Sequence, residues 1–330
     1  MRPFLDDIAG RLREIQARGL HRGLAEPEGV DFSSNDYLGI SRHPLLRSRL
    51  AEAIQSDPIS APASRLLGGH LPEHAALEER LARFKGTEAA LLFPSGYQAN
   101  LAVLTALIGP EDLAVSDERN HASIIDGLRL SGCTKAVYPH RDLGAAERAL
   151  RSRPPRGRAF LVTESLFSMD GDVAPLDEVA DMADRHGAAL IVDDAHATGL
   201  FGEKRGSGLC ERFGIEKRAA AIVSTFGKAL GLFGAFVTGP SLVIEYLINK
   251  ARPFIFTTAP PPLLAAAVHA ALDIVASEPK RRRQVIDLAD RLRASLRSTG
   301  IDTLGSSGPI VPVVLGENDR ALRVAERVRR

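Results

Sequence analysis

The stretch AALIVDDAHATGLFG, residues 188–202, decides the fold of this chain. It begins with a short apolar run that has the length and composition of a buried strand. Polar side chains follow where the strand would end, and Asp193 and His196 lie three residues apart. In open α/β sheets, ligands bind outside the carboxyl ends of the strands. The stretch therefore predicts a buried strand with a functional site at its carboxyl end.

Six further apolar runs resemble this strand. Segments of helical period alternate with them, and EHAALEERLARF places Leu77, Leu81 and Phe84 on one helix face. This alternation is typical of βα units that build a parallel sheet. We therefore predict an α/β fold with a large, seven-stranded, mainly parallel sheet. The other six strands are AALLF (89–93), DLAVS (112–116), KAVYP (135–139), AFLVTE (159–164), AAIVST (220–225) and GAFVTG (234–239).

The pattern changes after residue 258, where two long helical stretches precede one β-like run, PIVPVVLG (309–316). We expect an N-terminal segment (1–40), a large α/β domain (41–250) and a smaller α+β domain (251–330). The two helical stretches carry apolar stripes at Leu264, Val268, Leu272 and Val275, and at Val285, Leu288, Leu292 and Leu296.

Charge and cysteine content narrow the class of protein. Lys and Arg number 42 against 41 Asp and Glu, so neither nucleic acid nor a membrane surface is expected as the main partner. The chain has no uninterrupted apolar run of membrane-spanning length, and its first residues lack the apolar core of a signal peptide. Two cysteines, Cys133 and Cys210, cannot form a disulfide framework. We expect a cytoplasmic protein with a small-molecule partner.

Polar turns follow several of the predicted strands. Gly96 and Tyr97 begin a helix after residues 89–93, where free N–H groups can bind a phosphate, although an ordinary turn would look the same. His121 and Ser168 follow two other strands, and a lone histidine is more often structural. Asp193 by itself could cap a helix or bind a metal, but no second cluster has ligand spacing, so no metal is expected. Their joint position favours a single site.

The stretch STFGKALGLFGAF (224–236) adds Lys228 to this site. A neutral lysine amine is a nucleophile toward an aldehyde, and apolar surroundings lower its pKa by disfavouring the ammonium form. Gly227, Gly231 and Gly234 would leave room for a flat ligand, and Thr225 offers a hydroxyl to a phosphate. A surface lysine is the simpler alternative. Together with the aspartate and the phosphate-binding turn, however, the lysine indicates pyridoxal 5'-phosphate.

Six sequence blocks resemble, in order, the signature blocks of the α-oxoamine synthases, and the resemblance extends over the whole chain. The resemblance implies dependence on pyridoxal phosphate and the aspartate-aminotransferase-like fold of PLP-dependent transferases. The blocks are FSSNDYLG (32–39), FPSGYQAN (93–100), NHASI (120–124), TESLFSMDGD (163–172), VDDAHATGLFGEKRGSG (192–208) and STFGKALG (224–231).

Within this family, the chain is most similar to the biotin-pathway branch, in FSSNDYLG and in SRLLGGHLPEHAALE (64–78). That branch condenses L-alanine with a pimeloyl thioester, of CoA or of acyl carrier protein, and releases carbon dioxide. Two alternatives stay open: a sibling acyltransferase such as one that uses glycine and an acetyl thioester, and a catalytically silent binding subunit. A dinucleotide-dependent dehydrogenase is excluded because GKALGLFG (227–234) lacks the GxGxxG spacing.

The resemblance also implies roles for individual residues around the cofactor ring. Lys228 would bind the cofactor aldehyde and then move the α proton of the substrate. His121 would stack on the ring, and Asp193 would pair with its protonated nitrogen. His196 and Ser168 would hydrogen bond to the phenolic oxygen of the cofactor.

Other matched residues would bind the phosphate and the substrates. The backbone of Gly96 and Tyr97 and the hydroxyl of Thr225 would contact the phosphate. In a homodimer, Thr257 and Thr258 would reach the phosphate of the neighbouring subunit.

Asn35 would lie near the amino acid substrate, and the acyl substrate would face GLHRGL (19–24). There, His21 stands where biotin-pathway relatives commonly have an arginine, and Arg22 follows it, which leaves the acyl-chain specificity open. The family usually continues some tens of residues past AERVRR (325–330), with an arginine that binds the substrate carboxylate. We therefore expect the chain to be truncated at its C-terminus and its smaller domain to be incomplete.

Overall fold

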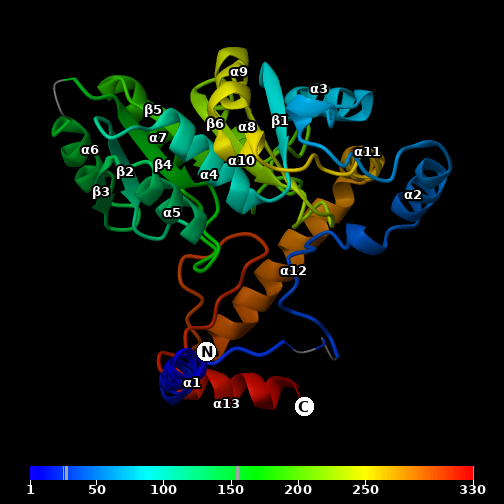
Figure 1. Ribbon diagram of the computed structural model, residues 1–330. Coiled ribbons are helices and arrows are strands. Elements are labelled where there is room, and N and C mark those ends of the chain that lie inside the picture. Colours follow the sequence, from blue (N-terminus) through cyan, green and yellow to red (C-terminus); the bar gives the residue numbers. More distant parts are fainter. Residues whose placement is uncertain (25, 27–28, 154–155, 330) are drawn as a thin grey trace.

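The computed structural model describes residues 1–24, 26, 29–153 and 156–329, and a seven-stranded sheet forms its core (Figure 1). The strand order is β1-β7-β6-β5-β4-β2-β3. All neighbouring strands pair in parallel except β7, which is antiparallel to both β1 and β6. The predicted α/β fold and mainly parallel sheet are confirmed. The strands are β1 (Ala89–Phe93), β2 (Leu113–Asp117), β3 (Thr134–Tyr138), β4 (Ala159–Glu164), β5 (Ala189–Asp193), β6 (Ala219–Thr225) and β7 (Ala235–Gly239).

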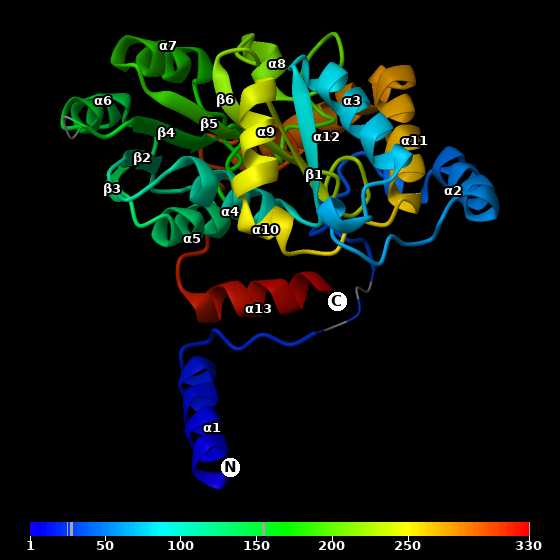
Figure 2. The same ribbon diagram turned by 45° about the horizontal axis from the view of Figure 1, so that its top comes forward.

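Helices cover both faces of the sheet, and each face has its own cluster of buried apolar side chains (Figure 2). Central strands with apolar side chains on both faces need such cover, which is why they read as continuous apolar runs. One face packs against α4 (Gly96–Leu107), α5 (Ala122–Leu130), α9 (Ser241–Lys250) and α10 (Arg252–Ile255). The other packs against α2 (Pro44–Ser56), α3 (Pro72–Lys85), α6 (Leu143–Arg151), α7 (Leu176–His186), α8 (Leu209–Phe213) and α11 (Leu263–Ser277).

The helix α11 packs against α2 and α3, and its predicted apolar stripe is buried at Val268, Leu272 and Val275. The stripe predicted on α12 (Pro279–Ser298) is only partly buried: Val285 packs against the core, whereas Leu288 and Leu292 are 56% and 42% exposed. The predicted domain boundaries stay a prediction.

The strand predicted at residues 309–316 does not form, and this prediction is wrong. Pro309 and Pro312 have no N–H to donate to a sheet, and no described strand lies beside the segment to pair with it. The described part of residues 251–329 therefore contains helices and irregular segments but no strand. In this part of the chain the expected α+β pattern is corrected to a helical one.

Two terminal helices lie on the same side of the molecule, away from the sheet (Figure 1). They are α1 (Arg2–Ala17) and α13 (Asn318–Arg329), and neither has a buried residue. The side-chain amide of Asn318 donates to the carbonyl oxygen of Arg18 at 3.1 Å, which links α13 to the end of α1. Two short 3-10 helices, η1 (Ile40–Arg42) and η2 (Arg65–Leu67), complete the described elements. No described helix is both long and apolar enough to cross a membrane. Cys133 and Cys210 are buried free thiols.

Candidate active site

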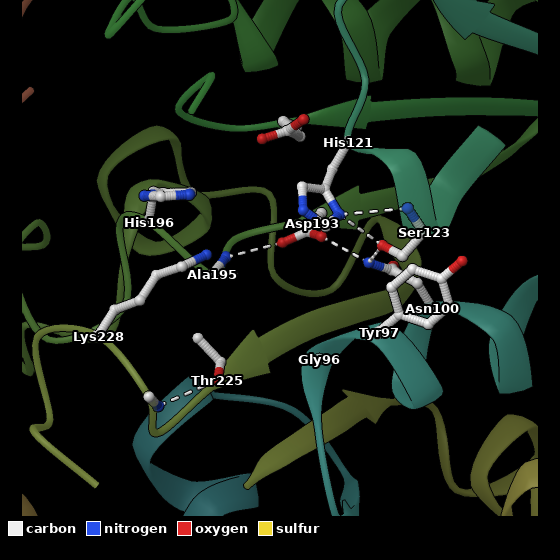
Figure 3. Close-up of a pocket in the computed structure, with 12 residues that line it drawn as sticks. Gly96, Tyr97, Asn100, His121, Ser123, Asp193, Ala195, His196, Thr225 and Lys228 are labelled. Atoms are coloured by element: carbon white, nitrogen blue, oxygen red, sulfur yellow. Dashed lines mark hydrogen bonds between the residues drawn. The ribbon is translucent and has the colours of Figure 1, made fainter. Parts of the chain in front are cut away.

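A cavity of about 210 Å³ opens at the carboxyl ends of the central strands (Figure 3). The last residue of β4, the loops after β5 and β6 and the first turns of α4 and α5 meet there. The structure brings seven of the predicted site residues together in its wall: Gly96, Tyr97, His121, Asp193, His196, Thr225 and Lys228. The other lining residues are Asn100, Ser123, Glu164, Ala195 and Gly227.

Lys228 lies in the link between β6 and β7, and its side chain extends toward Asp193 (Figure 3). Burial lowers the pKa of Lys228, whereas the charges of Asp193 and Glu164 raise it less strongly. The acidic groups that are missing from its own stretch are therefore supplied by the ends of β4 and β5. Burial of a lysine amine at a ligand cavity favours the neutral, nucleophilic form.

Two of the three glycines expected to make room for a ligand have another role. Only Gly227 lines the cavity. Gly231 has a φ of 65°, and a Cβ there would lie 2.4 Å from the backbone nitrogen of Ser41. Gly234 has a φ of 101°, with Phe226 3.2 Å from the position of a Cβ. These two glycines permit left-handed turns and close packing of the Lys228 link, so the prediction that they make space for a ligand is wrong.

Asp193, the last residue of β5, is held by two donors. The Asn100 side-chain amide donates to Oδ2 at 2.7 Å, and the backbone N–H of Ala195 donates to Oδ1 at 3.0 Å. The same amide donates to Ser123 Oγ at 2.9 Å, and Ser123 Oγ lies 2.8 Å from His121 Nδ1. Such donors stabilise a carboxylate charge, so this network presents a fixed anion to the cavity.

His196 is oriented by Tyr37, which belongs to the sequence block FSSNDYLG (32–39). Tyr37 Oη lies 2.8 Å from His196 Nδ1 and donates to Asn35 Oδ1 at 3.1 Å. Burial lowers the pKa of His196 to about 3, with further contributions from the positive charges of Lys228 and His121. The imidazole is therefore neutral near pH 7.

The first turns of α4 and α5 both face the cavity. Gly96 begins α4, whose N-cap Ser95 accepts from the backbone of Gln98, and the first N–H groups of a helix have no acceptor within it. His121 caps α5 by accepting from the backbone of Ser123.

Two other wall residues already have partners. The Tyr97 hydroxyl donates to Asp126. The Thr225 hydroxyl donates to the carbonyl of Gly234 at 2.9 Å, so a contact with phosphate would require a change of partner.

Six predicted site residues do not line this cavity: His21, Arg22, Asn35, Ser168, Thr257 and Thr258. Asn35 is connected to it through Tyr37 and His196. Ser168 lies in the loop after β4. Thr258 forms an isolated bridge with Ser64. The roles expected for these residues stay predictions.

Sequence reasoning missed four wall residues, three of which have polar side chains. Asn100 lies four residues after Gly96, so both lie on one helix face, and this spacing was a usable signal. Ser123 is part of NHASI and follows the N-cap. Glu164 ends an apolar run, and its inward direction depends on strand register, which the sequence does not give. Ala195 carried no signal of its own.

A separate group of potential metal ligands lies outside the cavity. Ligand atoms of His140, Asp170 and Asp172 lie within 4.8 Å of one another. His140 Nε2 already contacts Asp172 at 2.9 Å, and Arg141 pairs with the same carboxylate at 3.1 Å. These contacts balance the acidic charge without an ion. The expectation that no metal takes part stays a prediction.

Comparison with the sequences of known proteins shows which family the chain resembles. The sequence profile of the family Aminotransferase class I and II matches residues 27–329. The 8-amino-7-oxononanoate synthase of Anaeromyxobacter dehalogenans is 46% identical over 99% of this chain and 85% of its own length. The protein of the same name from Geobacter sulfurreducens is 44% identical over 97% of this chain and 86% of its own length.

Solved structures show the same fold. A serine palmitoyltransferase variant from S. paucimobilis, bound to a PLP–myriocin aldimine, superposes with a TM-score of 0.88 and 26% identity over 98% of this chain and 89% of its own. The 8-amino-7-oxononanoate synthase of Francisella tularensis gives a TM-score of 0.78 and 28% identity over 91% of this chain and 85% of its own. This chain therefore belongs to the aminotransferase class I and II family.

Proposed function

We propose that this chain is an 8-amino-7-oxononanoate synthase, a pyridoxal-phosphate-dependent acyltransferase of biotin biosynthesis. It would join L-alanine to a pimeloyl thioester and release carbon dioxide and the thiol. The relatives that are 46% and 44% identical over nearly the whole chain support this choice. The observation that carries the chemistry is the meeting of the Lys228 amine and the Asp193 carboxylate in one buried cavity.

The cavity fits pyridoxal phosphate by the chemistry of its donors. Asp193 offers a carboxylate to a protonated ring nitrogen, and Lys228 offers an amine to the aldehyde. The first N–H groups of α4, at Gly96 and Tyr97, can bind the phosphate. His121 lines the same cavity, and we propose that it packs against the ring. When bound, the cofactor supplies an electron sink that stabilises negative charge on the α carbon of the amino acid.

The residues of the chain then bind the ligand and move protons. Lys228 Nζ is the base for the α proton of L-alanine, because burial lowers its pKa and favours the neutral amine. His196 stays neutral near pH 7, and in the tautomer whose Nδ1 accepts from the Tyr37 hydroxyl its Nε2–H can donate to the phenolic oxygen of the cofactor without adding a charge. Ser168 is proposed as a second partner of that oxygen, which requires its loop to approach the cavity.

The assembly and the cellular location are also proposals. We propose a homodimer in which Thr257 and Thr258 of one subunit complete the phosphate site of the other, as the family resemblance implies. Sedimentation equilibrium would test the dimer directly. The two free thiols fit a reducing compartment such as the cytoplasm.

The first test is cofactor attachment. The purified chain is mixed with pyridoxal phosphate, desalted, reduced with borohydride and digested. We expect a visible absorbance band before reduction and a cofactor-modified peptide that contains Lys228. Lys228→Ala should lose the adduct, whereas Lys250→Ala, at an exposed residue at the end of α9, should retain it. A protein that stays colourless with excess cofactor refutes the proposal.

The second test concerns the substrates. Thiol release is followed for pimeloyl-CoA with L-alanine, acetyl-CoA with glycine and palmitoyl-CoA with L-serine. We expect the first pair to be used most efficiently, by kcat/KM. A preference for either other pair assigns a sibling activity in its place. A protein that binds the cofactor but releases no thiol from any pair supports the silent binding subunit.

A further inference from the structure

The cavity holds a second carboxyl group that the proposed chemistry does not use. Glu164 is the last residue of β4, and Asp193, the last residue of β5, is its register partner on the neighbouring parallel strand. Both side chains line the cavity, and Glu164 is only 2% exposed. Two carboxyl groups thus stand side by side at one end of the sheet.

The two carboxyl groups differ in their partners. Both oxygens of Asp193 accept hydrogen bonds from N–H groups. For Glu164, the backbone N–H groups of His121 and Ser168 lie toward the carboxyl group, but Oε1 has no partner among the described residues. Buried polar atoms are almost always paired, and an unpaired one in a ligand cavity requires an explanation. Glu164 Oε1 is therefore a buried polar atom without a partner in the wall of the cavity.

Four other titratable residues line the cavity around Glu164. They are Asp193 beside it, Lys228 on the β6–β7 link, and the imidazoles of His121 and His196. Burial, together with the Asp193 charge, raises the pKa of Glu164 to about 8, although Lys228 opposes this shift. Neighbouring carboxyl groups in different environments commonly divide into one charged and one neutral member. Near pH 7, Glu164 is therefore the neutral member of the pair.

We propose that Glu164 contacts the ligand of this cavity as a neutral carboxylic acid that donates a hydrogen bond to an anionic oxygen. This inference rests on the proposed function, because the ligand is pyridoxal phosphate with its amino acid substrate. Two oxygens share the required chemistry: the phenolic oxygen of the cofactor and the carboxylate of the amino acid. The proton stays on Glu164, and its loss would place a second negative charge beside Asp193 and repel the ligand.

The test compares cofactor binding by the wild-type apoprotein and by Glu164→Gln, which is permanently neutral and keeps an N–H donor. The dissociation constant for pyridoxal phosphate is measured by absorbance titration between pH 6.5 and 9.5. The matched control is Glu79→Gln on α3, whose side chain is 72% exposed. The pH effect of the ligand itself is common to all three proteins and cancels in the ratio of dissociation constants. The Glu164 charge raises the pKa of Lys228, so the Lys228 titration is measured separately in each protein.

We expect Glu164→Gln to bind within about threefold of the wild type at pH 7. Above pH 8 the wild type should weaken relative to Glu164→Gln by about tenfold per pH unit, as Glu164 loses its proton. The ratio for Glu79→Gln should stay near one throughout. If the same divergence instead appears only in the binding of L-alanine to the cofactor-loaded proteins, the contacted oxygen is the amino acid carboxylate.

A ratio that is independent of pH in both titrations overturns this inference and leaves the proposed function intact. Circular dichroism and the thermal midpoint establish that each variant is folded. Glu164→Ala, which has no donor, should bind the cofactor or the amino acid about tenfold more weakly than Glu164→Gln at pH 7. Equal binding by Glu164→Ala and Glu164→Gln would also overturn the inference. If no protein binds pyridoxal phosphate, the proposed function itself fails, and this inference fails with it.

Discussion

Substitution of Lys85 by methionine should destabilise the protein strongly, because Lys85 is one half of a buried ion pair. Its ammonium group donates to Asp194 Oδ2 at 2.7 Å, to Thr198 Oγ1 at 2.9 Å and to the carbonyl of Ser207 at 2.6 Å. The Lys85 and Asp194 side chains are 1% and 0% exposed. Methionine keeps most of the apolar stem, so the change removes the charge and its three hydrogen bonds while leaving little empty space.

The expected loss follows from what remains around Asp194. Its carboxylate would keep the hydroxyl of Ser165 at 2.6 Å and the backbone N–H of Leu209 at 3.2 Å, but no positive partner. Removing one partner of a buried pair costs about 3–5 kcal/mol, because the other charge stays buried. We therefore expect Lys85→Met to lower the free energy of unfolding by about 4 kcal/mol.

Urea denaturation, followed by circular dichroism and extrapolated linearly to water, measures this loss. Lys204→Met, at an exposed residue of the same region, should stay within about 0.5 kcal/mol of the wild type. The double variant Lys85→Met/Asp194→Asn should be more stable than Lys85→Met alone, because it buries no uncompensated charge. A loss below about 1 kcal/mol for Lys85→Met, or no recovery in the double variant, would refute the reasoning.

Two further predictions concern hydrogen bonds of histidine. Tyr37→Phe removes the hydrogen bond between the Tyr37 hydroxyl and His196. Because one hydrogen bond contributes a net stabilisation of about 1 kcal/mol, we expect pyridoxal phosphate to bind roughly fivefold more weakly in an absorbance titration. Unchanged affinity would contradict a role of Tyr37 in orienting the imidazole. Burial lowers the pKa of His140. The hydrogen bonds and negative charges of Asp117 and Asp172 together raise this pKa by more than burial lowers it, so the pKa lies above its ordinary value. Its contribution to stability is then complete below pH 6.5 and is lost as the pH rises through the folded pKa; urea midpoints between pH 6 and 9 should show this fall in the wild type and not in His140→Ala.

Six of the seven strands were predictable because they are almost entirely buried, whereas the predicted strand β3 is mostly exposed. GAFVTG (234–239) and AAIVST (220–225) differ from the observed β7 and β6 by one residue at their starts. The antiparallel direction of β7 was not predicted, since an apolar run carries no direction. The link at residues 226–234 is too short for a helical crossover, and that length was an available signal for an antiparallel neighbour.

The parts that could not be predicted depend on contacts between distant residues. PIVPVVLG (309–316) has strand-like composition, but a strand forms only where another strand pairs with it. Asp193 was recognised at a strand end, whereas Glu164 was not, although the two are register partners. A single strand shows only that alternate side chains point to opposite faces, and the sheet decides which of them meets the ligand.

The link that carries Lys228 has a consequence for how the amine can move. The link joins two hydrogen-bonded neighbours, β6 and β7, and is closed by bonds from Phe226 N to Gly234 O at 2.9 Å and from Leu232 N to Phe226 O at 2.8 Å. A shift of its backbone would break these bonds and the strand pairing beside them. The Lys228 amine is therefore expected to move by rotation about the bonds of its own four methylene groups, from a backbone that stays in place.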